Sequence, residues 1–171
     1  MYSCRRLEKS IIKIVKIIKI EHLGARIRMQ IKTLEDTELR DKLRRFVYDL
    51  IGCCQEVHKE KGPELTEYVY QECLDIAFED AKIIHKKEYY FNPTFRGRKL
   101  KTKLKVDFYC KGKVFLECKA IDNLSNHERI QLTNYMRNAG IRIGILYNFA
   151  PVFAECEKYY LDPETNTLYY F

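Results

Sequence analysis

The stretch that decides the fold is Val106-Asp107-Phe108-Tyr109-Cys110-Lys111-Gly112-Lys113-Val114-Phe115-Leu116-Glu117-Cys118-Lys119, in which two apolar segments flank a glycine. Gly112 indicates a tight turn, so the stretch is predicted to form a β-hairpin whose three-residue loop is Cys110–Gly112. A loop of odd length places Asp107 and Glu117 on the same face, roughly 5–8 Å apart. Because side chains alternate along a strand, Lys119 joins them on that face.

Two carboxylates and a lysine on one otherwise apolar hairpin are costly unless something compensates their charge. A divalent cation would do so, and Mg²⁺ and Mn²⁺ both accept carboxylate oxygens. Such a cation activates water for phosphodiester hydrolysis. Lys119 could position or deprotonate that water, or stabilise the developing charge. The alternative is a solvated strand face on which Glu117 and Lys119 merely pair.

Two helices are predicted before the hairpin. Apolar residues recur at helical spacing from Thr37 to about Lys61, and Gly62-Pro63 then interrupts the chain. Pro63 suits the first turn of a second helix that reaches about Asp80. The side chains assigned to its buried face are Leu65, Tyr68, Val69, Cys73 and Ile76. Its other face would present Glu64, Glu67, Tyr70 and Leu74, and Glu67 would be a further carboxylate for the site.

For the rest of the chain the sequence mainly predicts strands, over residues 82–91, 94–95, 99–110, 113–120 and 141–148. A tyrosine-rich β-hairpin is predicted from residues 155–161 and 167–171. Ser125 and Glu128 form a capping box that opens a helix ending near Gly140. This order predicts an α/β fold with a mixed central sheet flanked by helices and a C-terminal β-hairpin.

A row of lysines alternates with apolar residues on the long predicted strand, on the same face as Asp107; it comprises Lys99, Lys101, Lys103 and Lys105. Such a row suits a nucleic-acid backbone. It equally suits an edge strand that lysines protect from aggregation. On the following helix, Gln131 and Tyr135 share one face at four-residue spacing.

Charge and composition narrow the classes of function. The net charge is +7, but residues 1–28 contribute eight basic and two acidic residues, so the remaining body is nearly neutral and any nucleic-acid site must be a local patch. The seven cysteines form no C-x-x-C pair, which favours free thiols in a reducing cytoplasm. No apolar run is long enough to span a membrane. We therefore expect a cytoplasmic protein.

Residues 1–30 differ from the remainder in composition, because a lysine recurs every third residue within the apolar run 11–20. We expect a basic, poorly ordered extension over 1–30 and one domain over 31–171. The alternative for the extension is a helix lying on an anionic membrane surface.

Several motifs, in the same order, resemble the GxxExxY protein family of the PD-(D/E)XK nuclease superfamily, close to RecB-type nucleases. The resemblance covers about residues 38–171, and the segments that carry it are 51–60, Glu64-Leu65-Thr66-Glu67-Tyr68-Val69-Tyr70, Val106-Asp107-Phe108, Glu117-Cys118-Lys119-Ala120, Gln131-Leu132-Thr133-Asn134-Tyr135 and 144–149. The leading glycine of the naming motif is Glu64 here. A glutamate is favourable at a helix start, so we expect the fold to tolerate it.

The resemblance implies a restriction-endonuclease-like core and a metal-dependent nuclease. Asp107 and Glu117 would be ligands of Mg²⁺ or Mn²⁺, together with the backbone carbonyl of Cys118, and Lys119 would be the catalytic lysine. Glu67 and Gln131 would support catalysis, and Tyr135 would belong to the nucleic-acid contact. The expected partner is nucleic acid, in the first place DNA, with a homo-oligomer as a further expectation. The alternative function is a non-catalytic protein that keeps the nuclease fold and binds nucleic acid or another partner.

Overall fold

The computed structural model describes the chain over residues 16–22 and 25–171, with side chains from residue 31 onward. The expected poorly ordered extension and membrane-surface helix therefore lie partly outside the described residues. Within them, β1 (Lys16–His22) and β2 (Ala25–Thr33) pair as an antiparallel hairpin. β2 runs across residue 30, and the domain boundary at that position stays a prediction.

The centre of the fold is an eight-stranded mixed sheet in the order β1-β2-β10-β9-β8-β7-β6-β3. Its other strands are β3 (His85–Phe91), β6 (Leu104–Cys110), β7 (Val114–Lys119), β8 (Ile143–Asn148), β9 (Glu155–Leu161) and β10 (Leu168–Tyr170). β7 and β8 pair in parallel, which requires a crossover connection, and α3 (Asn126–Ala139) provides it. The predicted mixed α/β architecture is confirmed.

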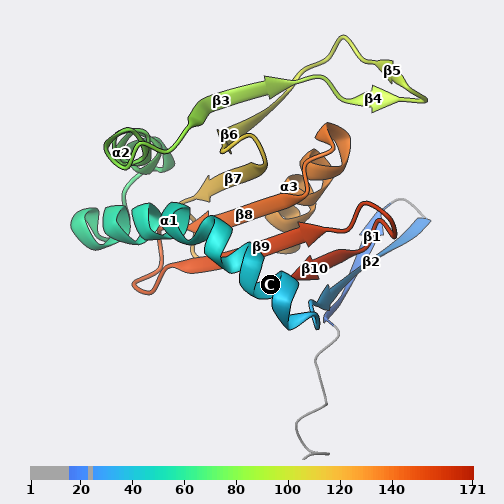
Figure 1. The fold of residues 1–171 in the computed structure, drawn as a ribbon, viewed down its shortest axis with the longest axis horizontal. Coiled ribbons are helices and arrows are strands. Elements are labelled where there is room, and N and C mark those ends of the chain that lie inside the picture. Colours follow the sequence, from blue (N-terminus) through green and yellow to red (C-terminus); the bar gives the residue numbers. More distant parts are fainter. Residues whose placement is uncertain (1–15, 23–24) are drawn as a thin grey trace, which may run out of the picture.

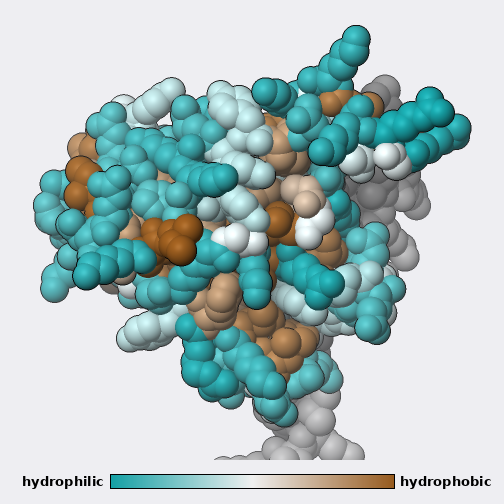
Figure 2. Space-filling model, turned by 45° about the horizontal axis from the view of Figure 1, so that its top comes forward, coloured by the Kyte–Doolittle hydropathy of each residue, from teal (hydrophilic) through white to brown (hydrophobic). Residues whose placement is uncertain are grey.

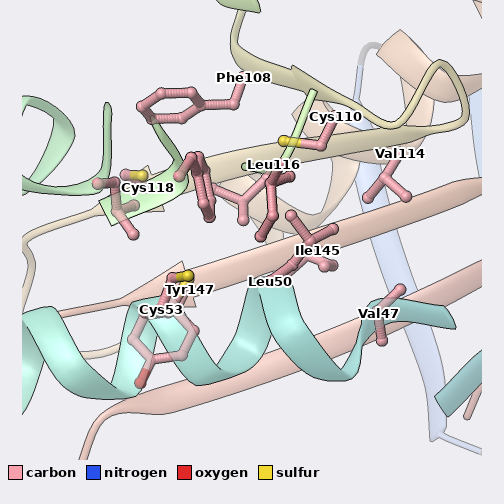
Figure 3. Packing of buried hydrophobic residues seen from close by; sticks show 14 of the residues in the cluster. Val47, Leu50, Cys53, Phe108, Cys110, Val114, Leu116, Cys118, Ile145 and Tyr147 are labelled. Carbon is pink, nitrogen blue, oxygen red and sulfur yellow. The ribbon is translucent and has the colours of Figure 1, made fainter. Parts of the chain in front are cut away.

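Helices cover both faces of this sheet (Figure 1). α1 (Thr37–Lys61) and α2 (Glu67–Asp80) bury their apolar side chains with Phe108, Leu116 and Ile145 in one core cluster. α3 packs Leu132 and Met136 into a second cluster. Figure 3 shows the first cluster, with labelled side chains of α1, β6, β7 and β8 that include Val47, Leu50, Cys53, Phe108, Leu116, Cys118, Ile145 and Tyr147.

Several local predictions are confirmed by hydrogen bonds at the ends of elements. The predicted start of α1 at Thr37 is confirmed, and the Asp36 side chain caps it by accepting from the Leu39 N–H at 2.9 Å. Ser125 and Glu128 form the complete capping box of α3, which ends at Gly140 with a left-handed φ of 69°. β9 and β10 form the C-terminal hairpin. The six cysteines among the described residues are all free thiols.

The second helix differs from its prediction in both its start and its buried face. α2 begins at Glu67, not at Pro63, and it buries Tyr70, Leu74 and Phe78. Tyr68 and Ile76, assigned to the core from the sequence, are 67% and 60% exposed. The helix has apolar residues on two faces, so periodicity alone could not identify the one that packs against the sheet.

The long strand predicted over 99–110 is also wrong, because β5 (Arg98–Lys99) and β6 are separated by residues 100–103. Asn92 Nδ2 donates to the Leu100 carbonyl at 2.9 Å and to the Thr102 carbonyl at 3.4 Å, which replaces strand pairing here. The four lysines therefore do not form one strand row. The short strand β4 (Thr94–Phe95) and the turn at Gly97 are confirmed.

Candidate active site

The hairpin that carries the site turns over Lys111–Lys113, one residue later than predicted, since Cys110 pairs with Val114 and Phe108 with Leu116. Lys111 and Gly112 have left-handed φ values of 52° and 66°. The loop still has an odd length. The same register, continued by one step beyond Phe108 and Leu116, sets Asp107 opposite Glu117.

Simple alternation along β6 does not hold at Asp107. Val106 packs into the core cluster under α3, whereas Phe108 packs into the cluster under α1 and α2. In β3, the residue that the register places opposite Asp107 is Glu88, which has a φ of 49°. The Asp107 carboxylate is held instead by β7, because the Cys118 backbone N–H donates to its Oδ2 at 2.8 Å.

The two hairpin carboxylates are almost completely buried. Glu117 is 2% exposed and Asp107 is 8% exposed. Burial, followed by the charge of Asp107, raises the pKa of Glu117 to about 8. Burial also raises the pKa of Asp107, although the Cys118 N–H and the Lys119 ammonium oppose the shift. The raised pKa values of Glu117 and Asp107 follow from two carboxyl groups that lie close together in a poorly solvated site.

Lys119 provides the counter-charge, with its Nζ 3.1 Å from Glu117 Oε2. Burial alone would lower the pKa of Lys119, but Glu117, Glu67 and Asp107 outweigh burial and raise it. The lysine is thus held as an ammonium ion in the metal-free protein. This favours charge stabilisation and positioning over proton abstraction, two of the roles that the sequence left open.

Glu67, the first residue of α2, interacts electrostatically with Asp107 and Lys119. It is half-buried, and its pKa is raised chiefly by burial, with Lys119 lowering it and Asp107 raising it. Gln71, one turn later, donates from Nε2 to Glu67 Oε1 at 3.2 Å and is itself buried. The sequence reasoning missed Gln71, although its four-residue spacing from Glu67 is a signal for such a contact.

The naming motif of the resembled family has a separate structural reason for each of its positions. Glu64, at the glycine position, has a left-handed φ of 67° and does not start the helix. Tyr70 donates from its hydroxyl to the Gly62 carbonyl at 2.7 Å, accepts from the Leu65 N–H, and stacks on Phe149. Glu64 and Tyr70, the first and last positions of the motif, thus shape the loop that directly precedes Glu67.

The donor set fits a hard divalent cation. Glu117 Oε1 is buried and has no hydrogen-bond partner, an arrangement that is costly unless another group uses that oxygen. Carboxylate oxygens are the ligands that Mg²⁺ and Mn²⁺ prefer. Within residues 31–171, no three His, Cys, Asp or Glu side chains come together as a metal-binding group, so the candidate set is the carboxylate pair. The Cys118 carbonyl as a third ligand stays a prediction.

Of the remaining predicted site residues, Lys105 is linked to this centre by its charge. The charge of Lys105 acts on both Glu67 and Asp107, while its Nζ pairs with Glu88 at 2.7 Å. Gln131 donates to the Tyr135 hydroxyl at 3.2 Å on α3. Lys99, Lys101 and Lys103 are exposed on the segment before β6. The roles of these residues towards a substrate stay predictions.

Asn148 and Glu155 fix the chain that leaves the site, and neither was singled out from the sequence. Asn148 is fully buried; its Oδ1 accepts from the Ile121 N–H and its Nδ2 donates to the Ile121 carbonyl at 2.7 Å. Glu155 accepts from Asn148 Nδ2 and from the Leu124 N–H. The loop that directly follows Lys119 is therefore anchored to β8 and β9.

Comparison with known proteins identifies the class that this fold and site define. The family model of the PD-(D/E)XK nuclease superfamily matches residues 44–159, which include Glu67, Asp107, Glu117 and Lys119. The chain therefore belongs to the PD-(D/E)XK nuclease superfamily, and the predicted restriction-endonuclease-like fold is confirmed. Membership of the narrower GxxExxY family stays a prediction.

No curated protein matches the chain. Among solved structures, one titled "Crystal structure of SSO0001" is similar, with 19% sequence identity and a TM-score of 0.45 over 58% of this chain. The match covers 53% of that chain, so the two proteins share about half of its length. Within the described residues, no helix is long and apolar enough to cross a membrane.

Proposed function

We propose that this protein is a metal-dependent nuclease that hydrolyses phosphodiester bonds in DNA or RNA at Asp107, Glu117 and Lys119. The observation that carries the proposal is the buried carboxylate pair with an ammonium group at 3.1 Å and one carboxylate oxygen without a partner. A structural ion pair does not need a second buried carboxylate, whereas a cation site does.

Asp107 and Glu117 would hold Mg²⁺ or Mn²⁺, which when bound supplies Lewis-acid catalysis of hydrolysis. The protein contributes a nearly dry site in which each charge acts strongly. Lys119 would stabilise the negative charge that develops on the phosphate. Burial raises the pKa of Glu67, which makes its carboxylate a stronger base towards water, and Gln71 would orient it.

The nucleic-acid backbone would approach from the side of Lys105, whose charge already acts on the site. Lys99, Lys101 and Lys103 would extend this contact along the exposed segment before β6. Gln131 and Tyr135, joined by a hydrogen bond, would contact the substrate from α3.

Calorimetric titration with Mn²⁺ tests the metal site directly. The variant is Asp107→Ala/Glu117→Ala, and the matched control is Glu72→Ala/Glu79→Ala, which removes two exposed carboxylates from α2. We expect the wild type and the control to bind Mn²⁺ and the Asp107/Glu117 variant to lose that binding. Single-stranded, double-stranded and branched substrates are then screened for cleavage with the same three proteins.

Two results would contradict the proposal. Mn²⁺ binding that is equal in all three proteins would place the cation elsewhere. Normal Mn²⁺ binding without cleavage of any substrate would favour the alternative, a non-catalytic protein that binds nucleic acid or another partner.

A further inference from the structure

Apart from the basic residues 1–28, the basic residues of this chain are concentrated around β3, β4 and β5. Residues 82–105 hold nine of the 31 lysines and arginines but only one of the 24 acidic residues, Glu88. The whole chain has a net charge of +7, so all the residues outside this segment sum to about neutral. A single-sign patch of this density attracts a polyanion from solution.

The centre of this segment is a β-ribbon arm, residues 94–103, in which every residue is exposed. Thr94 pairs with Lys99 and Phe95 with Arg98, so the turn consists of Arg96 and Gly97. Both turn residues have left-handed φ values, 49° and 75°, as a two-residue type I′ hairpin requires. Figure 1 shows β4 and β5 projecting beyond the main sheet, and the same corner is largely hydrophilic in Figure 2.

The base of the arm is braced. Asn92 donates to the carbonyls of Leu100 and Thr102, and the Leu100 N–H donates to the Pro93 carbonyl at 2.9 Å. At the tip, Phe95 is 62% exposed and the Arg96 guanidinium lies 5.2 Å from its ring centroid. The arm therefore has a defined direction and presents five basic residues without an acid, namely Arg96, Arg98, Lys99, Lys101 and Lys103.

The arm leads directly into the candidate active site. Lys103 is followed by β6, and Asp107 is four residues further along the chain. At the rise of an extended strand, the base of the arm is about 13 Å from Asp107. A nucleic acid held by the arm thus has its backbone near the carboxylate pair.

We infer that the β-ribbon arm lies in the major groove of a DNA duplex and holds that duplex at the active site, an inference that rests on the proposed nuclease function. The major groove of B-form DNA is about 12 Å wide and admits a two-stranded β-ribbon. The major groove of an RNA duplex is deep and narrow, and side chains cannot read it. A single strand offers no groove at all. The shape of the arm therefore selects double-stranded DNA as the substrate class.

Fluorescence anisotropy tests this inference with full-length protein in EDTA, so that no cleavage occurs. The probes are a short labelled DNA duplex, an RNA duplex of the same sequence and the corresponding DNA single strand. The arm variant is Arg96→Gln/Arg98→Gln/Lys99→Gln. The control is Lys42→Gln/Arg44→Gln/Lys59→Gln, which removes the same charge from exposed positions outside the basic segment 82–105.

We expect the arm variant to bind the DNA duplex at least about tenfold more weakly than the control variant does, with a salt-dependence slope reduced by about 2 to 3. Wild-type protein should bind the DNA duplex more tightly than the other two probes. Equal affinities of the two variants for the DNA duplex, or equal wild-type affinities for the DNA and RNA duplexes, would overturn the inference. Because this readout needs no metal, it is separable from a failure of Mn²⁺ binding, which would contradict the nuclease instead.

Discussion

Glu117 should destabilise the metal-free protein at neutral pH, and Glu117→Gln should relieve that cost. Burial and the charge of Asp107 raise the pKa of Glu117 from 4.5 to about 8. An acid whose pKa is higher in the folded state binds its proton more tightly there than in the unfolded chain. Stability is therefore lost as the pH rises from about 4.5 through about 8.

The size of this loss follows from the pKa difference. Each tenfold difference in proton affinity is worth about 1.4 kcal/mol, so at pH 7 the wild type loses on the order of 3 kcal/mol. Glutamine has nearly the same shape and is neutral at every pH, so it takes up no proton on folding. The raised pKa of Glu117 already includes the opposing attraction of Lys119. We expect Glu117→Gln to be on the order of 3 kcal/mol more stable than wild type at pH 7.

Urea denaturation in EDTA at pH 4, 7 and 8 measures the effect. The free energy of unfolding that Glu117→Gln gains over wild type should increase with pH. It should fall towards zero at pH 4, where both the folded and the unfolded wild-type chain are protonated at Glu117. In Mn²⁺ the order should reverse, because the cation stabilises only the protein that binds it. Glu72→Gln, an exposed change on α2, is the control and should leave stability nearly unchanged.

A variant that is less stable than wild type at pH 7 and 8 in EDTA would refute this reasoning. It would mean that Glu117 is stabilised by its ion pair with Lys119 more than it is penalised by burial. A gain that does not change with pH would also refute it, since the cause would then be packing and not ionisation.

Three further substitutions probe the loop, the core and the chemistry. Glu64→Gly should stabilise the protein by about 1 kcal/mol in urea denaturation, because the left-handed φ of 67° is strained for glutamate; a loss would show that the side chain compensates the strain. Gly144→Ala should cost about 1–3 kcal/mol, since a Cβ would overlap Met136 Sδ, and a double-mutant cycle should show a smaller cost in Met136→Ala. Lys119→Gln should lower cleavage about 10²–10³-fold while Mn²⁺ affinity, measured by calorimetry, is kept or increased; lost Mn²⁺ binding would assign the lysine to cation binding instead.

Short-range features of the sequence predict much of the architecture correctly. Ser125 with Glu128, and Gly140, mark helix ends through contacts within a few residues. Gly112 marks the hairpin turn. The predicted loop position was wrong by one residue, but its predicted odd length was correct. These predictions succeed because the interactions that decide them are local in the chain.

The candidate site was predictable in its membership but not in its geometry. Asp107, Glu117, Lys119 and Glu67 come together as the motif order implies. Alternation along β6 did not predict the orientation of Asp107, because β7 holds that carboxylate through the Cys118 N–H. Asn148 was missed because its partner Ile121 lies 27 residues away in the chain. Gln71 was missed although its partner Glu67 lies only four residues away on the same helix.

The sequence by itself determined the mixed α/β class, most helix ends and the residues of the candidate site, because these depend on short motifs and on neighbours within a few positions. Only the tertiary structure decided which face of α2 is buried, since that helix has apolar residues on two faces and Phe149 and Phe108 select one of them. It alone decided that Glu117 is almost completely buried beside Asp107 and Lys119. It also separated the basic arm from β6, because Asn92 binds the carbonyls that a continuous strand would have used.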